Sequence, residues 1–222
     1  MRHPIFARVY ERASAQMDRA GAAEHRHALV ADLRGRVIEV GAGNGRMFPH
    51  YPSAVTEVLA VEPEPYLRAA AEAAARTAPV PVRVVEGLAD ALPAADGTFD
   101  AAVAALVLCS VPDQAAALAE LRRVLRPGGQ LRFLEHVVAE HPGGLRRAQR
   151  IVDATVWPRL LGGCHTGRDT LAAITAAGFT VDEVHRFRFP PSGPQGPAAP
   201  HVRGRATAAV TPPGHRLAAP PR

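Results

Sequence analysis

Residues 37–45 read Val-Ile-Glu-Val-Gly-Ala-Gly-Asn-Gly, a short and mostly apolar run that ends in three closely spaced glycines. The run is typical of a buried strand. The glycines after it allow a sharp turn and let a ligand approach the backbone closely. In an open α/β sheet, ligands bind beyond the carboxyl ends of the strands. The stretch therefore predicts an α/β fold with a cofactor loop after its first strand.

Strand and helix patterns alternate downstream of this stretch. Short apolar runs predict five strands, at residues 37–40, 58–61, 82–85, 99–108 and 130–138. A helix is expected over 66–76, since Pro65 suits a first helical position, and another from Pro112 until residues 127–129 (Pro-Gly-Gly) stop it. Further helices are expected at 145–156 and 169–177, and further strands at 179–187 and 202–210. This alternation predicts a mostly parallel sheet with helices on both faces.

The chain of 222 residues, 47% of them apolar, is long enough for one α/β domain. We expect an N-terminal helical cap at 1–34, with one helix over about 5–33, then the main domain at 35–210 and a disordered tail at 211–222. No apolar run is long enough for a membrane span, and the charged N-terminus is unlike a signal peptide, which predicts a cytoplasmic protein. The basic, amphipathic start leaves peripheral membrane contact open.

The net charge of +5 comes with 26 basic residues that are all arginine, scattered along a chain rich in Ala, Pro and Gly. This pattern indicates a composition bias rather than a nucleic-acid surface. Cys109 and Cys164 lie far apart in sequence and form no C-x-x-C motif, so no metal site is expected and both are expected to be free thiols.

The spacing of the glycines bears on which cofactor binds. The G-x-G-x-x-G pattern of nicotinamide enzymes would need glycine at Arg46, whereas the third glycine here is Gly45. Glu39 inside the strand suits a ligand with an amino group and a sulfonium better than a pyrophosphate. Glu62 ends the second strand, where a carboxylate can accept hydrogen bonds from ribose hydroxyls.

With these residues placed, the chain resembles class I S-adenosylmethionine-dependent methyltransferases with a type 11 methyltransferase domain. Four ordered motifs carry the resemblance: 39–45, Glu62-Pro63, 87–93 followed by 97–100, and 125–129. The resemblance implies a Rossmann-like seven-stranded sheet whose last strand is antiparallel, and it implies S-adenosylmethionine as cofactor.

The resemblance also implies roles for individual residues. Glu39 and the loop of Gly41, Ala42, Gly43, Asn44 and Gly45 would face the methionine part of the cofactor. Glu62, with Pro63, would hold the ribose, Ala89 and Asp90 would border the adenine, and Leu106 would cover the cofactor. Many relatives have Asp where this chain has Leu88, so the adenine amino group needs another partner, such as Asp90 or a backbone carbonyl.

A narrower resemblance is to the methyltransferase-like alkyl-thiol methyltransferases and their bacterial relatives, which include quinone and phospholipid-headgroup enzymes. It rests on the stretches 106–111 and 134–137, on Trp157, on Gly163-Cys164 with Arg168, and on 200–202 with Gly204. The mammalian relatives carry an N-terminal membrane anchor that we do not expect here. The resemblance favours a thiol acceptor, with a quinol or an amine as alternatives.

Methyl transfer needs the nucleophile, the methyl carbon and the sulfur held in line, and a base only where the nucleophile carries its proton. His136, near the end of the fifth strand and the mouth of the cleft, is the first candidate for base or substrate ligand, and His165 is the second. Cys109 is expected to line the pocket as an apolar thiol. Tyr10 and Trp157 could line it or simply pack.

Two other functions remain open at this point: a nicotinamide-dependent oxidoreductase, and a protein that binds S-adenosylmethionine only to regulate. Methylation of nucleic acid is disfavoured, because the apolar stretch 105–108 (Ala-Leu-Val-Leu) stands where base-amino methyltransferases carry Asn-Pro-Pro-Tyr or Asp-Pro-Pro-Tyr. The acceptor expected is small and partly apolar. The sequence does not indicate the oligomeric state.

Overall fold

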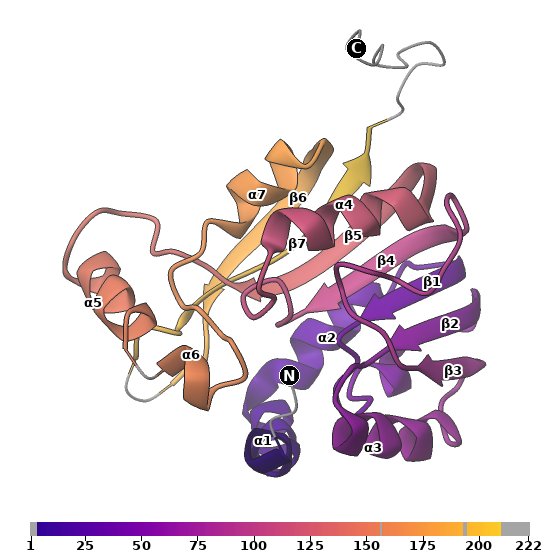
Figure 1. The fold of residues 1–222 in the computed structure, drawn as a ribbon, viewed down its shortest axis with the longest axis horizontal. Helices are drawn as coiled ribbons and strands as arrows, with labels where there is room; N and C mark the ends of the chain where they lie inside the picture. Colours follow the sequence, from indigo (N-terminus) through magenta and orange to yellow (C-terminus); the bar gives the residue numbers. More distant parts are fainter. Residues whose placement is uncertain (1–3, 156, 193–194, 210–222) are drawn as a thin grey trace, which may run out of the picture.

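The computed structural model describes residues 4–155, 157–192 and 195–209. A seven-stranded sheet with the order β3-β2-β1-β4-β5-β7-β6 crosses the molecule (Figure 1). Its strands are β1 (Gly35–Val40), β2 (Val55–Val61), β3 (Val82–Val85), β4 (Phe99–Ala105), β5 (Leu125–His136), β6 (Phe179–Arg188) and β7 (Pro200–Ala208).

The sheet is parallel from β3 to β5, and β7 runs antiparallel to both of its neighbours, β5 and β6. The expected seven-stranded, mostly parallel sheet with an antiparallel last strand is therefore confirmed. Val40 pairs with Val61 on one side and with Ala104 on the other, so β1, β2 and β4 end at the same edge. The chain order reverses between β1 and β4, which is where open α/β sheets bind ligands.

Helices cover both faces of the sheet, as the alternation predicted (Figure 1). The helices are α1 (Pro4–Met17), α2 (Ala23–Val30), α3 (Pro65–Ala75), α4 (Gln114–Val124), α5 (Gly144–Asp153), α6 (Trp157–Leu160) and α7 (Thr170–Ala176), and a 3-10 turn spans Phe48–His50. Leu118 of α4 and Ile174 of α7 belong to the core on one face. Leu29 of α2 and Ala71 of α3 belong to the core on the other.

The expectation of one N-terminal helix over 5–33 is wrong. A π-helical segment, Asp18–Ala22, separates α1 from α2, and Gly21 within it has a φ of 111°. A left-handed glycine cannot continue an α-helix, so the chain bends there. The bend is compatible with α1 packing against α3 while α2 stays on the sheet.

Other boundaries differ by a few residues, for local reasons. The fourth strand ends at Ala105, short of the predicted 108, because Leu106 adopts a φ of 61°. Helix α4 begins at Gln114 instead of Pro112, since the Asp113 side chain accepts a hydrogen bond from the Ala116 N–H and caps it. The predicted tail at 211–222 and the ends at Val156 and Val210 lie outside the described residues. Within the described part of the chain, no helix combines the length and apolar character needed to cross a membrane.

Candidate active site

The glycine loop that follows β1 is tied to the end of β2. The N–H groups of Gly41 and Ala42 both donate to the Val61 carbonyl, at 2.8 and 3.1 Å. The Gly43 N–H donates to a carboxylate oxygen of Glu62, at 2.8 Å. These bonds hold the loop in one conformation at the sheet edge where a ligand is expected.

The loop has no room for larger side chains. Gly41 has a φ of 66°, and a Cβ there would lie 2.5 Å from Val107, which follows β4. Gly43 has a φ of 56°, and its Cβ would lie 3.2 Å from the ring of Tyr10 on α1. The loop is therefore enclosed between the N-terminal helix and the segment after β4. Of the two roles open to Tyr10, the structure has it packing on this loop.

Glu62 and Asn44 supply buried polar groups beside the loop. Glu62 also accepts a hydrogen bond from the Glu64 N–H at 2.9 Å; burial raises its pKa, while its two backbone donors oppose that shift. The Asn44 amide donates to Ser14 of α1 at 3.0 Å, and its Oδ1 is buried without a hydrogen-bond partner among the described residues. A buried acceptor without a donor is costly unless a ligand supplies one.

Glu39 lies inside the sheet and contacts a residue that the sequence reasoning missed. The Tyr51 hydroxyl donates to Glu39 at 2.8 Å, and both side chains are buried. Burial raises the pKa of Glu39 to about 8, against the hydrogen bond from Tyr51 and the charge of buried Arg26 on α2. A tyrosine twelve residues downstream gives no sequence signal for this contact.

The expected adenine side follows β3. Gly87 lies against Val61, so this loop borders the end of β2. Ala89 packs against the core while Asp90 is exposed. Leu88, at the position where relatives have Asp, has a side chain that is 51% exposed.

Leu106 and Glu135 shape the end of β4. Leu106 is the one described residue other than glycine with a positive φ, a strained backbone of the kind found at binding sites. The carboxylate of Glu135 is fully buried and accepts hydrogen bonds from the N–H groups of Val107, Leu108 and Cys109, at 2.9–3.1 Å. Burial raises the pKa of Glu135, and the three donors counteract it. The reasoning from sequence gave Glu135 no role, although a carboxylate in an apolar strand was a usable signal.

Beyond the ends of β4 and β5, two thiols and an imidazole meet. The sulfur of Cys164 lies 3.3 Å from Nδ1 of His136 and 4.0 Å from the sulfur of Cys109. Contact with Cys164 and burial raise the pKa of Cys109 to about 12, while contact with Cys109 lowers that of Cys164. Burial lowers the pKa of His136, but the neighbouring Cys109 and Glu135 outweigh it, so the net shift is upward. Although Cys109 and Cys164 are 55 residues apart in sequence, their sulfurs lie close together in the fold.

His165, the second catalytic candidate, borders this cluster through its backbone. Its N–H donates to the Cys109 carbonyl at 2.8 Å, while its ring Nδ1 lies 2.7 Å from the Gly163 carbonyl. His201, which had no expected role, places its ring 4.5 Å from that of His136, measured between centroids, and burial lowers its pKa to about 3. The imidazole of His201, which packs against His136, is therefore neutral.

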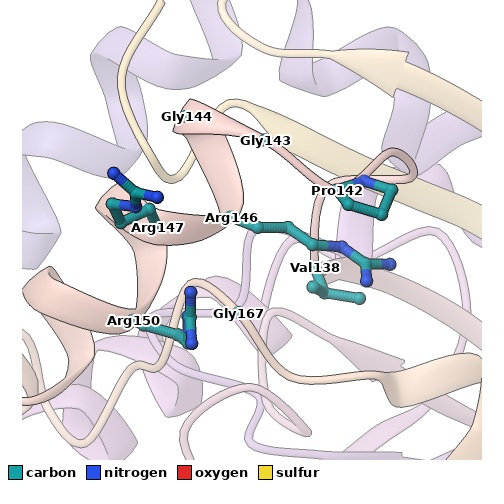
Figure 2. Close-up of a pocket in the computed structure, with 8 residues that line it drawn as sticks. All are labelled: Val138, Pro142, Gly143, Gly144, Arg146, Arg147, Arg150 and Gly167. Carbon is teal, nitrogen blue, oxygen red and sulfur yellow. The ribbon is translucent and has the colours of Figure 1, made fainter.

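A hollow of about 600 Å³ lies near α5, away from the glycine loop. Figure 2 shows three arginines of α5 around it, and Arg146 is held by hydrogen bonds to the carbonyls of Ala139 and Glu140. Its lining residues are Val138, Pro142, Gly143, Gly144, Arg146, Arg147, Arg150 and Gly167. No residue expected to bind the cofactor is among them.

Features of the loop region fit S-adenosylmethionine, the cofactor that the resemblance implies. Glu62 can accept further hydrogen bonds, and the free Oδ1 of Asn44 can accept one from a ligand amine or hydroxyl. The glycine loop, Glu62 and Asn44 carry no positive charge with which to bind a pyrophosphate.

Comparisons with known proteins agree with the geometry. Residues 38–133 match the family described as a methyltransferase domain. The thiol S-methyltransferase TMT1B of Homo sapiens is 34% identical over 173 residues, which cover 77% of this chain and 69% of that protein. The thiol S-methyltransferase TMT1A of Homo sapiens is also 34% identical, over 175 residues, with the same coverage of each chain.

Solved structures share the fold. A geranyl diphosphate methyltransferase in complex with S-adenosylmethionine superposes with a TM-score of 0.66 at 16% identity, covering 86% of this chain and 85% of that one. The family and the cofactor set aside the nicotinamide-dependent and purely regulatory alternatives. The chain belongs to the class I S-adenosylmethionine-dependent methyltransferases, which transfer the methyl group of this cofactor to an acceptor.

Proposed function

We propose that this methyltransferase methylates the sulfur of a small, partly apolar thiol. The observation that carries the proposal is the 34% identity to thiol S-methyltransferase TMT1B over 77% of the chain. The segment after β4, between the two halves of the site, supports it, because Leu106 and Val107 are apolar and the Glu135 carboxylate accepts hydrogen bonds from backbone N–H groups.

The residues of the cofactor half hold the cofactor in this proposal. The loop Gly41–Gly45 lies along its methionine part, with Glu39 beneath as the partner for the amino group. Glu62 accepts from the ribose hydroxyls beside Pro63, Ala89 and Asp90 border the adenine, and Leu106 covers the cofactor. When bound, S-adenosylmethionine supplies a methyl group already activated by its sulfonium.

The residues beyond the ends of β4 and β5, which we call the acceptor half (Cys109, Glu135, His136, Cys164 and His165), orient the thiol and take up its proton. A thiol with a pKa near about 8.5 is partly ionised at neutral pH, whereas an amine with a pKa near about 10.4 is almost wholly protonated. The task left to His136, with His165 next to it, is to favour the thiolate and hold it in line with the methyl group. Water is excluded by the burial of Cys109 and Cys164.

The test compares acceptors that share one carbon skeleton. The purified protein is given S-adenosylmethionine with an alkyl thiol, the matching alcohol, the matching amine or a quinol, and the methylated product is measured by mass spectrometry. We expect the thiol to be methylated at least about tenfold faster than the others. Faster methylation of the amine or the quinol would overturn the thiol assignment.

The cytoplasmic location expected from the sequence stays part of this proposal. Cell fractionation with an antibody against the protein would check it. If the protein were recovered with the membranes and released from them by high salt, it would instead be attached peripherally through basic residues.

A further inference from the structure

Cys109, His136 and Cys164 come from three separate parts of the fold. Cys109 follows β4, His136 ends β5, and Cys164 follows α6. Their sulfur and nitrogen ligand atoms all lie within 4.8 Å of one another, and both cysteines are free thiols. Two thiols and an imidazole nitrogen are ligands that Zn²⁺ prefers in proteins.

The spacing of the three donors matches a tetrahedral metal. With Zn–S bonds of about 2.3 Å and Zn–N bonds of about 2.0–2.1 Å, tetrahedral angles separate two sulfurs by roughly 3.8 Å, and a sulfur from a nitrogen by roughly 3.5 Å. The observed separations are 4.0 Å for the sulfurs and 3.3 Å for Cys164 Sγ and His136 Nδ1. These two separations differ from the tetrahedral values by about 0.2 Å each, and the sulfur of Cys109 lies within 4.8 Å of the His136 nitrogen.

The backbone around Cys109 is fixed from several sides. The Cys109 N–H donates to Glu135 at 3.1 Å, and its carbonyl accepts from the His165 N–H. Arg168 donates to the carbonyls of Leu108 and Val111 on either side, at 2.8 and 2.7 Å. Because the Cys109 backbone is already fixed, its thiol loses little conformational freedom when it binds a metal, which favours affinity.

We propose that Cys109, His136 and Cys164 bind one Zn²⁺ ion, whose fourth position takes the sulfur of the acceptor thiol. The inference rests on the proposed function and deepens it, because His136 then acts as a ligand through Nδ1 instead of as a base. Three protein ligands with one open position are the pattern of catalytic zinc sites, and closed four-ligand sites are structural.

The chemistry balances without a redox partner. The acceptor R–SH releases its proton to solvent as its sulfur binds the metal, and the thiolate keeps the electron pair. That pair forms the new bond to the methyl carbon, while the bond from this carbon to the cofactor sulfur breaks and leaves its electrons on that sulfur. The products are the thioether R–S–CH₃, S-adenosylhomocysteine and one proton.

The first test is metal binding itself, without any turnover. The protein is purified in reducing buffer, stripped with a chelator and titrated with Co²⁺, which reports thiolate ligands and tetrahedral geometry in its visible spectrum. We expect one Co²⁺ per chain, intense tetrahedral bands with thiolate charge transfer, and displacement by one equivalent of Zn²⁺. Absence of these bands in the folded wild type would overturn the inference.

Variants locate the site. Cys164→Ser and His136→Gln should each weaken Co²⁺ binding by more than about a hundredfold, because each removes one direct ligand. His141→Gln, which alters an exposed imidazole of the loop after β5, should leave binding unchanged. Circular dichroism checks that each variant is folded. Equal binding by a folded Cys164→Ser variant would place the metal elsewhere and overturn the assignment.

The acceptor test separates this inference from the proposed function. Adding an alkyl thiol to the Co²⁺-loaded protein should shift the charge-transfer bands, whereas the matching alcohol should not. Thiol methylation at an undiminished rate by metal-free protein would overturn the zinc site and leave the proposed function standing. A spectral shift with thiol but no methylation of it would retain the site and overturn the proposed function.

Discussion

The two halves of the catalytic edge are built by different kinds of contact. In the cofactor half, the loop after β1 is held by backbone bonds to Val61 and by Glu62, which come from the next strand of the chain, 19–20 residues further on. In the acceptor half, Glu135 reaches back 26–28 residues to three N–H groups, and Cys164 meets Cys109 across 55 residues. The backbone bonds of the first half join two consecutive strands, β1 and β2, while the second half also needs Cys164, which follows α6.

The substitution expected to have the largest effect on the cofactor half is Gly43→Asp. The new side chain would enter the space of the Tyr10 ring from a backbone φ of 56°, so cofactor binding should fall by more than about a hundredfold. Isothermal titration calorimetry with S-adenosylmethionine measures the loss.

Gly97→Asp is the matched control for Gly43→Asp. Gly97 has a similar φ of 59° and is exposed, and a Cβ added there would meet no atom within 4 Å. It should therefore carry the same backbone strain, of about 1 kcal/mol, without loss of binding. Equal losses in both variants would mean that strain, and not the cradle, explains the result.

The second prediction addresses the acceptor half. Glu135→Ala would leave three buried N–H groups without an acceptor, at about 1–3 kcal/mol each before the loop relaxes. We expect the melting temperature to fall by roughly 10 °C and kcat for the thiol to fall by at least about tenfold. Glu135→Gln, whose amide oxygen can still accept two of these bonds, should lie between wild type and Glu135→Ala.

The split between binding and turnover decides what Glu135 does. Because the bonds of the glycine loop to Val61 and Glu62 do not involve Glu135, the Kd for S-adenosylmethionine in the folded variants should change by less than about threefold. If cofactor affinity and kcat fell together, the two halves would behave as one cooperative unit. The contacts of the cofactor half and those of the acceptor half would then not be independent of one another.

The same difference explains what could be predicted from the sequence. The glycine loop, Glu62 and the order of strands follow from short motifs, so the fold and the place of the cofactor loop were predictable. The kink at Gly21 was missed, because a single glycine in a helical pattern is often tolerated and only tertiary packing decides whether it bends the chain.

The acceptor half was predictable only in part. His136 was a candidate because it lies near the end of a predicted strand, but its neighbour Cys164 was not assigned to the site. The cysteine spacing argued against a cluster that the fold nevertheless creates. Tyr51 and Glu135 were missed for a related reason, since each acts on a residue or loop that adjoins it only in the folded chain. No local period encodes such contacts.

The smallest expected effect concerns a charge within the cofactor half. Glu39 has a pKa of about 8 in the folded protein and about 4.5 when exposed, so its contribution to stability is complete below pH 4.5 and is lost as pH rises through 8. The free energy of unfolding should therefore fall by at most about 1.4 kcal/mol per pH unit in that window. The groups that face Glu39 are Tyr51, Arg26 and Glu62.

Glu39→Gln removes this titration but keeps an oxygen to accept from Tyr51, so its stability should change less with pH than that of wild type. Melting temperatures of the cofactor-free proteins between pH 5 and 8 measure the difference, with the exposed Glu72→Gln as control. Parallel profiles for wild type and Glu39→Gln would mean that Glu39 is already ionised when the protein folds. The cofactor half would then be preset for a cationic ligand. A steeper wild-type profile means that Glu39 is neutral in the empty site, so binding a cation there must also expel a proton.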